Sequence, residues 1–230
     1  IISMLSPPFL GAYSWILMLG RNGEITQLLK AVGISMPSIY GFGGMLLVFV
    51  LKLFPYIYMY TKGALKKVDA SLGEAAESLG YHGIRKVLKV SLPLVLPTIL
   101  AGATIVFLRA FADYGTPRLI GEGYSTLPVI VYQEWVSETG TNANFASAVA
   151  MIMIFVAAAV FLIQKYITNR KNYVMSMLNP PKPKQLKGLP NFLAHFYVYL
   201  IAILATLPQV YIILISFRNT KGVMWAEGYG

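Results

Sequence analysis

The sequence predicts an all-α protein, a polytopic transmembrane helix bundle. Of the 230 residues, 57% are apolar and only 12% are charged, and several runs of about 20 residues carry no charge. A soluble domain carries charge on about a quarter of its residues, and a bilayer core of about 30 Å needs about 20 helical residues to cross it. The chain has no Cys, which excludes disulfides, thiolate metal sites and a cysteine nucleophile.

The apolar segments, taken in order, give the expected spans. Residues 1–20 are uncharged but contain Pro7 and Pro8, and we interpret them as the end of a span whose beginning is missing. The full spans are expected at residues 40–61, 90–108, 145–164 and 191–217. We therefore expect a fragment that is truncated at both ends.

Basic residues are sorted between the loops, and this sorting predicts the orientation. The loop 62–92 and the segment 165–190 each hold six Lys or Arg, whereas residues 113–144 hold Arg118 against four acids. Because basic loops stay in the cytoplasm, the first two segments are expected inside and the third outside. Topology thus explains the formal charge of +10 without nucleic-acid binding.

The loops also carry local structure. In the outer loop 113–144, Thr126 is expected to cap a short helix that begins at Leu127 and Pro128. Residues 168–190 hold four prolines among lysines and predict a cytoplasmic linker that proline stiffens.

The cytoplasmic loop 62–92 has the most specific pattern. Ser71 and Glu74 form a capping box, so a helix is expected to start there and to end at Gly80 in a left-handed conformation. One face of this helix carries apolar side chains: Leu72, Ala75, Ala76 and Leu79.

A second short helix is expected after Gly80. Its apolar side carries Ile84, Val87 and Leu88, and we expect it to lie in the membrane interface. Pro93 then fits the first turn of that span.

Six residues of this loop carry a family pattern, at the motif's spacing: Glu74, Ala75, Ala76, Gly80, Leu92 and Pro93, with Val90 where the motif usually has Ile. They resemble the EAA loop of binding-protein-dependent ABC importer permeases, which have the type I importer fold. The resemblance implies a coupling helix that contacts ATP-binding cassette subunits, a pair of them, and an extracytoplasmic substrate-binding protein as a further partner. It also implies a multi-pass location in a prokaryotic inner or plasma membrane and no cofactor.

The same resemblance implies a domain order. Residues 1–167 would be the C-terminal part of a first permease module, with its EAA loop at 62–92 and an outer loop at 113–144. Residues 168–190 would be the linker, and 191–230 the first span of a second module in the same polypeptide.

The cargo suggested by the resemblance is ferric iron. The order of three short segments looks most like the ferric iron branch: Pro7-Pro8-Phe9-Leu10-Gly11, Phe54-Pro55-Tyr56 and Ala112-Asp113-Tyr114-Gly115. Such segments recur in permeases for thiamine, phosphonates, polyamines and molybdate, which stay open as alternatives.

Charges at membrane depth are the candidate translocation residues. Lys52 lies near the middle of its span, where it either lines the path and meets an anion or is held by the Leu51 carbonyl that Pro55 leaves without an amide partner. Arg109 and Asp113, four residues apart at the outer end of their span, can pair on one helix face. The resemblance implies the alternative that this region, with Tyr114, borders the path.

The sequence is open to two functions of different classes. Nothing in the chain matches the phosphate-binding pattern G-x-x-x-x-G-K-[ST], so the expected protein is a transport subunit that is not itself an enzyme. The alternative, an ion-coupled secondary transporter, usually needs an acid or His relay at membrane depth, and the spans offer no acid there. His82 and His195 are isolated, so no metal site is expected.

Overall fold

A computed structural model describes residues 7–136, 142–170 and 188–217, and within these ranges all regular structure is helical. Four helices are long and apolar enough to cross a membrane: Phe42–Leu65, Gly83–Phe111, Ala143–Asn169 and Leu189–Ser216. Each corresponds to one of the four expected full spans, so the all-α transmembrane fold is confirmed. The expected linker at 168–190 lies almost wholly outside the described residues.

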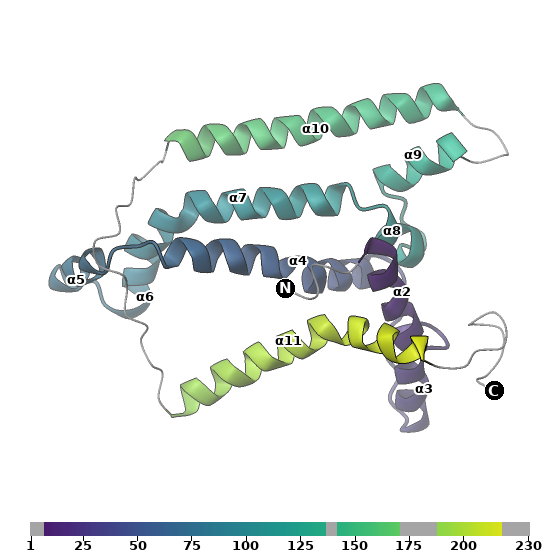
Figure 1. Cartoon of the computed structure of the whole chain (residues 1–230), viewed down its shortest axis with the longest axis horizontal. Helices are drawn as coiled ribbons and strands as arrows, with labels where there is room; N and C mark the ends of the chain where they lie inside the picture. Colours follow the sequence, from purple (N-terminus) through teal and green to yellow (C-terminus); the bar gives the residue numbers. More distant parts are fainter. Residues whose placement is uncertain (1–6, 137–141, 171–187, 218–230) are drawn as a thin grey trace. The chain divides into compact units, whose positions relative to one another are not determined.

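The chain divides into two compact units, which are described one at a time. Unit 1 comprises residues 1–52, 115–124 and 195–230, and unit 2 comprises residues 53–114 and 125–194. The long helix α4 (Phe42–Leu65) contributes its first part to unit 1 and the rest to unit 2, as can be followed in Figure 1.

Unit 1 is built around α2 (Pro8–Leu19), which packs on the short helix α8 (Gly115–Ile120). Its buried side chains come from α2, α8, the start of α4 and the loop before it: Ala12, Trp15, Met18, Ile39, Met45, Val48 and Ile120. Leu207 and Tyr211 of α11 (Leu189–Ser216) pack against this core. Two short helices here, α8 and α3 (Glu24–Ala31), had not been predicted from the sequence.

A tight turn holds the start of α4 against α8 in unit 1. Gly41 has a φ of +95°, and its N–H donates to the carbonyl of Ile120 at 2.7 Å. Such a φ is costly for a residue with a Cβ, so glycine suits this turn.

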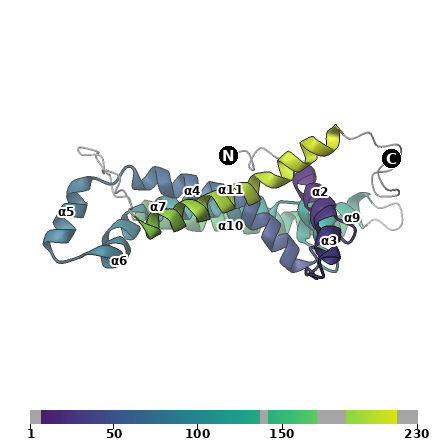
Figure 2. The ribbon, with the colours of Figure 1, turned by 90° about the horizontal axis from the view of Figure 1, so that it is seen from below.

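Unit 2 contains α5 (Ala70–Ser78), α6 (Gly83–Lys86), the π-helical segment η1 (Val87–Ser91), α7 (Leu92–Phe111), α9 (Leu127–Val136) and α10 (Ala143–Arg170). Helix α10 packs on both α7 and α9. Figures 1 and 2 both place α5 and α6 beyond the same end of α7.

The contact between α7 and the second part of α4 is close. A Cβ added to Gly102 would lie 2.9 Å from the Cβ of Tyr60, closer than side-chain atoms approach one another. Gly102 therefore sets the distance at which these two helices pack.

The short helix expected after Gly80 begins at Gly83, and Pro93 lies in the first turn of α7 as expected. The two are continuous, since residues 83–111 form one helix of 29 residues. Lys86, Ser91 and Leu92 all have right-handed helical dihedral angles, and the helix passes through a π turn before Pro93. A π turn re-spaces the backbone bonds, which fits a position next to a proline that lacks an N–H.

Two capping expectations also need correction. The N-cap of α5 is Asp69, whose side chain accepts a hydrogen bond from the N–H of Ser71, so Ser71 lies inside the helix. Helix α9 begins at Leu127 as expected, but among the described residues the buried hydroxyl of Thr126 has no hydrogen-bond partner. Thr126 does stand in the N-cap position, since its carbonyl accepts the first intrahelical bond, from the N–H of Ile130, but its side chain does not cap the helix.

The long helices expose apolar surface that a membrane would cover. In the most apolar 18-residue stretch of α10 only 11% of the residues are buried inside the protein, and Phe155 is 68% exposed. Soluble monomers rarely expose large contiguous apolar patches, so these helix faces agree with a multi-pass membrane protein.

Candidate functional site

The helix α5 has fixed ends. At its start the Asp69 carboxylate accepts from the Ser71 N–H at 2.9 Å. At its end Gly80 has a φ of +82°, its N–H donates to Glu77 O at 3.0 Å, and Tyr81 donates to Ala76 O at 2.9 Å. This pair of bonds is a Schellman motif, so the expected left-handed stop at Gly80 is confirmed.

The predicted apolar face of α5 is partly buried within the chain and partly exposed. Ala76 is 5% exposed, whereas Leu72 is 41% and Leu79 is 78% exposed. Glu74 and Ala75 are exposed as well. Of the expected coupling residues on α5, Glu74 and Ala75 therefore lie on the free side, and Ala76 lies against the chain itself.

The inward side of α5 packs on α6 and η1. Lys86 Nζ lies 2.8 Å from Glu77 Oε1 and crosses α5 beside Gly73, where an added Cβ would meet that Nζ at 2.9 Å. Lys89 Nζ lies 5.5 Å from the centre of the Tyr81 ring, within the range of a cation–π contact.

Leu92 and Pro93, the last two residues of the expected coupling set, open α7 and are both exposed. Since residues 83–111 form one helix, they lie on the same rigid element as Lys86. The six expected coupling residues are thus brought to one end of unit 2.

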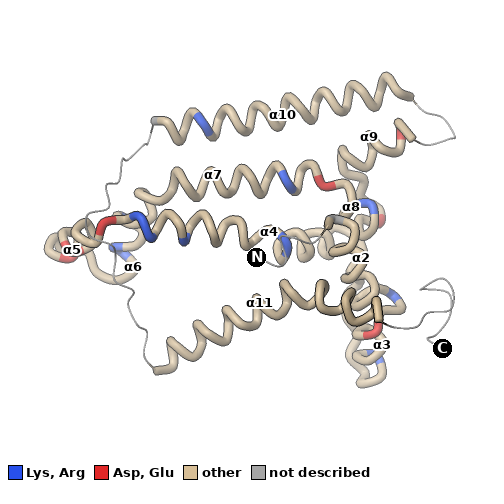
Figure 3. The backbone as a smooth tube through the Cα atoms, viewed as in Figure 1, with Lys and Arg blue, Asp and Glu red and all other residues tan. Residues whose placement is uncertain are grey.

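Charge is unevenly distributed in unit 2. Figure 3 shows basic and acidic segments where α5 and α6 lie, at one end of α7, and in residues 62–92 the six basic residues outnumber the acids Asp69, Glu74 and Glu77. This distribution is what the positive-inside rule requires if α5 faces the cytoplasm.

Lys52 borders a small pocket in unit 1. The cavity volume is about 20 Å³, room for about one water molecule. It is lined by residues of α2, α4 and α11: Gly11, Trp15, Val48, Leu51, Lys52, Ala205, Pro208 and Gln209. Lys52 itself is half-buried.

The other candidate path residues lie near the far end of α7. The guanidinium of Arg109 lies 4.6 Å from the centre of the Tyr56 ring. Helix α7 ends at Phe111, so Asp113 does not follow Arg109 on a helix face, and the spacing on which the expected pair rested does not apply. Asp113 is 8% exposed, and Tyr114 contacts Tyr132 with ring centres 4.6 Å apart.

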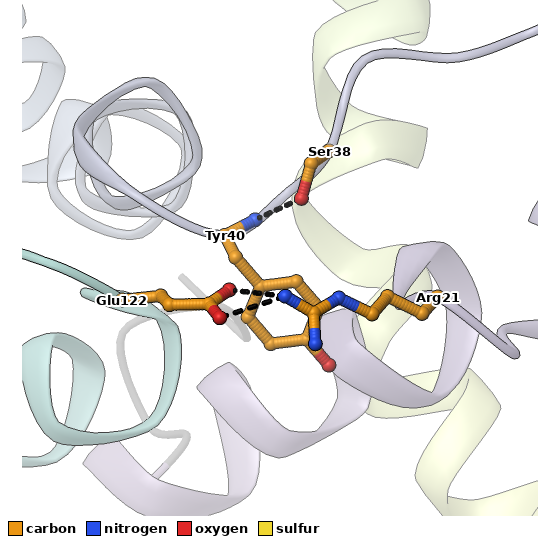
Figure 4. A network of polar contacts seen from close by, with 4 residues as sticks. All are labelled: Arg21, Ser38, Tyr40 and Glu122. Atoms are coloured by element: carbon orange, nitrogen blue, oxygen red, sulfur yellow. Dashed lines mark hydrogen bonds and ion pairs between the residues drawn. The ribbon is translucent and has the colours of Figure 1, made fainter.

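A polar cluster in unit 1 escaped sequence reasoning. Arg21 Nη2 lies 2.7 and 2.8 Å from the two carboxylate oxygens of Glu122, and its guanidinium lies 5.3 Å from the centre of the Tyr40 ring (Figure 4). The N–H of Tyr40 donates to Ser38 Oγ at 3.1 Å. Arg21 and Glu122 are 101 residues apart, and no short-range pattern links them.

Comparison with known proteins agrees with these features. The family model of the binding-protein-dependent transport system inner membrane component matches residues 1–173. A putative ferric transport system permease protein of Haemophilus influenzae is 31% identical over 76% of this chain and 28% of its own length. A ferric transport system permease protein of Actinobacillus pleuropneumoniae is 29% identical over 76% of this chain and 26% of its own length.

Relatives with other cargoes in their names are similarly close. A probable molybdenum ABC transporter permease protein of Haloferax volcanii is 31% identical over 70% of this chain and 57% of its own length.

The chain spans about a quarter of the length of the two ferric relatives, 28% and 26%.

Proposed function

Because this chain belongs to the family of binding-protein-dependent transport system inner membrane components, we propose that it forms part of the permease of an ATP-driven importer and that α5 couples it to the ATP-binding subunits. The observation that carries the proposal is α5 itself, a short helix with fixed ends whose outer side exposes Leu72 and Leu79 beyond the basic end of α7. Exposed apolar side chains on a rigid helix suit insertion into a groove of a partner.

In this proposal ATP hydrolysis and transport are carried out by different subunits. It holds no G-x-x-x-x-G-K-[ST] pattern, so the energy would come from ATP-binding cassette subunits, a pair of them, and the permease itself would catalyse no reaction. Closure of these subunits on ATP would displace α5 and rock the spans between inward and outward access. An extracytoplasmic binding protein would deliver cargo at the outer loops.

For the cargo we propose ferric iron. The support is the naming of two relatives, at 31% and 29% identity, as ferric permeases. A relative named for molybdenum at 31% identity and one named for 2-aminoethylphosphonate at 27% keep oxyanions and phosphonates as alternatives. Thiamine and polyamines rest on the motif resemblance alone.

For the path we propose Lys52, with Arg109, Asp113 and Tyr114 near the outer end of α7. A lysine at membrane depth costs about 2.5–3.5 kcal/mol on insertion scales, so it is expected to face protein or water. The pocket beside Lys52 supplies a polar neighbour from α11, Gln209.

The test is uptake into proteoliposomes by the full-length protein with its own ATP-binding subunits and binding protein. Radioactive ferric iron, molybdate and 2-aminoethylphosphonate are offered separately, with ATP inside or outside the vesicle and with or without ionophores. We expect uptake that requires ATP and survives collapse of the ion gradients. Uptake that needs the gradients and no ATP would favour the secondary transporter and refute the proposal.

A further inference from the structure

Two glycines flank the connection between α5 and α6. Gly80 and Gly83 have φ values of +82° and +56°, with only Tyr81 and His82 between them. Glycine samples many backbone conformations, so this connection alone is a poor means of transmitting a push. A rigid connection needs contacts that bridge the turn.

Lys86 supplies such a bridge. Its ammonium lies 2.8 Å from the Glu77 carboxylate, and its side chain is only 26% exposed because it lies across α5. An added Cβ at Gly73 would meet Lys86 Nζ at 2.9 Å and Cε at 3.1 Å, so the absence of a side chain at Gly73 makes room for the lysine.

Lys89 adds a second contact from the same helix. It follows Lys86 by three residues on the same continuous helix, within the π-helical segment η1. Its ammonium lies 5.5 Å from the centre of the Tyr81 ring, so one contact precedes the Gly80 turn and the other follows it. Ala76 of α5 is also buried, at 5% exposed.

The bridge ends on a membrane span. Residues 83–111 form one helix, so whatever holds α5 to Lys86 also holds it to α7. Contacts in the described residues thus join the exposed helix to a span without a break.

We propose that Lys86 is a positioning residue for coupling: its ion pair with Glu77 holds α5 against α6, so that movement imposed on α5 reaches α7 instead of being lost by rotation about Gly80 and Gly83. This inference rests on the proposed function, and it adds the residues that make the connection stiff. Ion pairs of such exposure shift an equilibrium by at most about fivefold, so a partial loss of coupling is expected on breaking it.

The experiment reads the movement of α7 without requiring a cargo. The full-length protein carries one Cys, in place of Ala110 near the outer end of α7, and is assembled in lipid nanodiscs with ATP-binding subunits that are free of Cys. The rate at which a water-soluble maleimide labels this Cys is measured with and without ATP plus vanadate. In a second preparation a Cys in place of Ala75 reports, by cross-linking, whether α5 contacts an ATP-binding subunit.

Four variants are compared with the parent: Lys86→Met, Glu77→Gln, the exchange Lys86→Glu with Glu77→Lys, and Arg85→Met. Arg85 is the matched control, because it lies next to Lys86 and, among the described residues, no ion pair or hydrogen bond of its side chain is found. We expect Lys86→Met and Glu77→Gln to reduce the ATP-dependent change in labelling by up to about fivefold, with cross-linking intact. The exchange should restore the change, and Arg85→Met should leave it as in the parent.

Four results would overturn the inference. A full labelling response in Lys86→Met with cross-linking intact removes the role of Lys86 and leaves the proposed function standing, as does a loss that the exchange fails to restore. A parent complex that cross-links but shows no ATP-dependent labelling refutes movement of α7. Absence of both signals in the parent refutes the proposed function together with this inference.

Discussion

Truncation of Leu79 to Ala should weaken the binding of the ATP-binding subunit while leaving the fold intact. Leu79 is 78% exposed, at the C-terminal cap of α5, where its φ of −84° suits alanine equally well. Because it makes little contact within the chain, its loss should change the free energy of unfolding by less than about 0.5 kcal/mol.

The magnitude follows from the exposed area. Leu→Ala removes three carbons, each worth about 0.8 kcal/mol when buried, or up to about 2.4 kcal/mol in all. Scaled by the 78% of the side chain that docking can still bury, the loss is at most about 1.9 kcal/mol, which corresponds to about 25-fold in Kd. Incomplete burial in the groove lowers this, so we expect a decrease in affinity of about five- to 25-fold.

The assay is titration of labelled ATP-binding subunit onto the full-length permease in nanodiscs. Leu28→Ala is the matched control, since Leu28 is also exposed, at 68%, but belongs to α3 in unit 1. A Kd for Leu79→Ala within twofold of the parent, or an equal loss for Leu28→Ala, would refute the assignment of α5 as the docking helix.

Three further predictions concern the loop, the helix packing and the path. Gly80→Ala should cost about 1–2 kcal/mol of unfolding free energy through its φ of +82° alone, since nothing lies within 4 Å, and Gly80→Asn should cost less; equal melting temperatures would contradict this. Gly102→Ala should lower the melting temperature in detergent, because overpacking against Tyr60 costs about 1–3 kcal/mol and the higher helix propensity of alanine offsets only about 1 kcal/mol. The control Gly63→Ala should be neutral or stabilising, because nothing lies within 4 Å of an added Cβ there. Lys52→Met should slow ATP-driven uptake in proteoliposomes with unchanged affinity for the ATP-binding subunit; uptake at the parent rate would remove Lys52 from the path.

Sequence patterns located the spans because each depends on local composition. A run of about 20 uncharged residues can be identified from that run alone, without knowledge of its neighbours in space. The helices α7, α10 and α11 each contain such a run, and α4 contains one that only Lys52 interrupts. The end of α5 could also be predicted from local sequence, since a glycine after an amphipathic stretch favours the left-handed helix end found at Gly80.

The start of α5 shows where a local pattern competes with another. Ser71 and Glu74 match a capping box, but Asp69 two residues earlier is as good an N-cap, and the structure uses it. Likewise the continuity of the helix over residues 83–111 could not be predicted from local patterns, because it depends on a π turn at Val87–Ser91, ahead of Pro93.

Contacts between distant segments could not be predicted from one sequence. Arg21 and Glu122 are 101 residues apart, and Glu77 and Lys86 are nine apart across a turn, outside the i, i+4 spacing that links charges on a single helix. The helices α3 and α8 have eight and six residues, too short for a hydrophobic period to stand out.

The π turn at Val87–Ser91 sets the angular phase between the two ends of a single rod. The N–H of Leu92 donates to the carbonyl of Val87, five residues back, one more than in an α-helix. An α-helix turns by about 100° per residue, and the wider π turn turns by less. The direction in which α5 leaves this rod, relative to the Tyr60 side of α7, is therefore one that a regular α-helix over the same residues would not give.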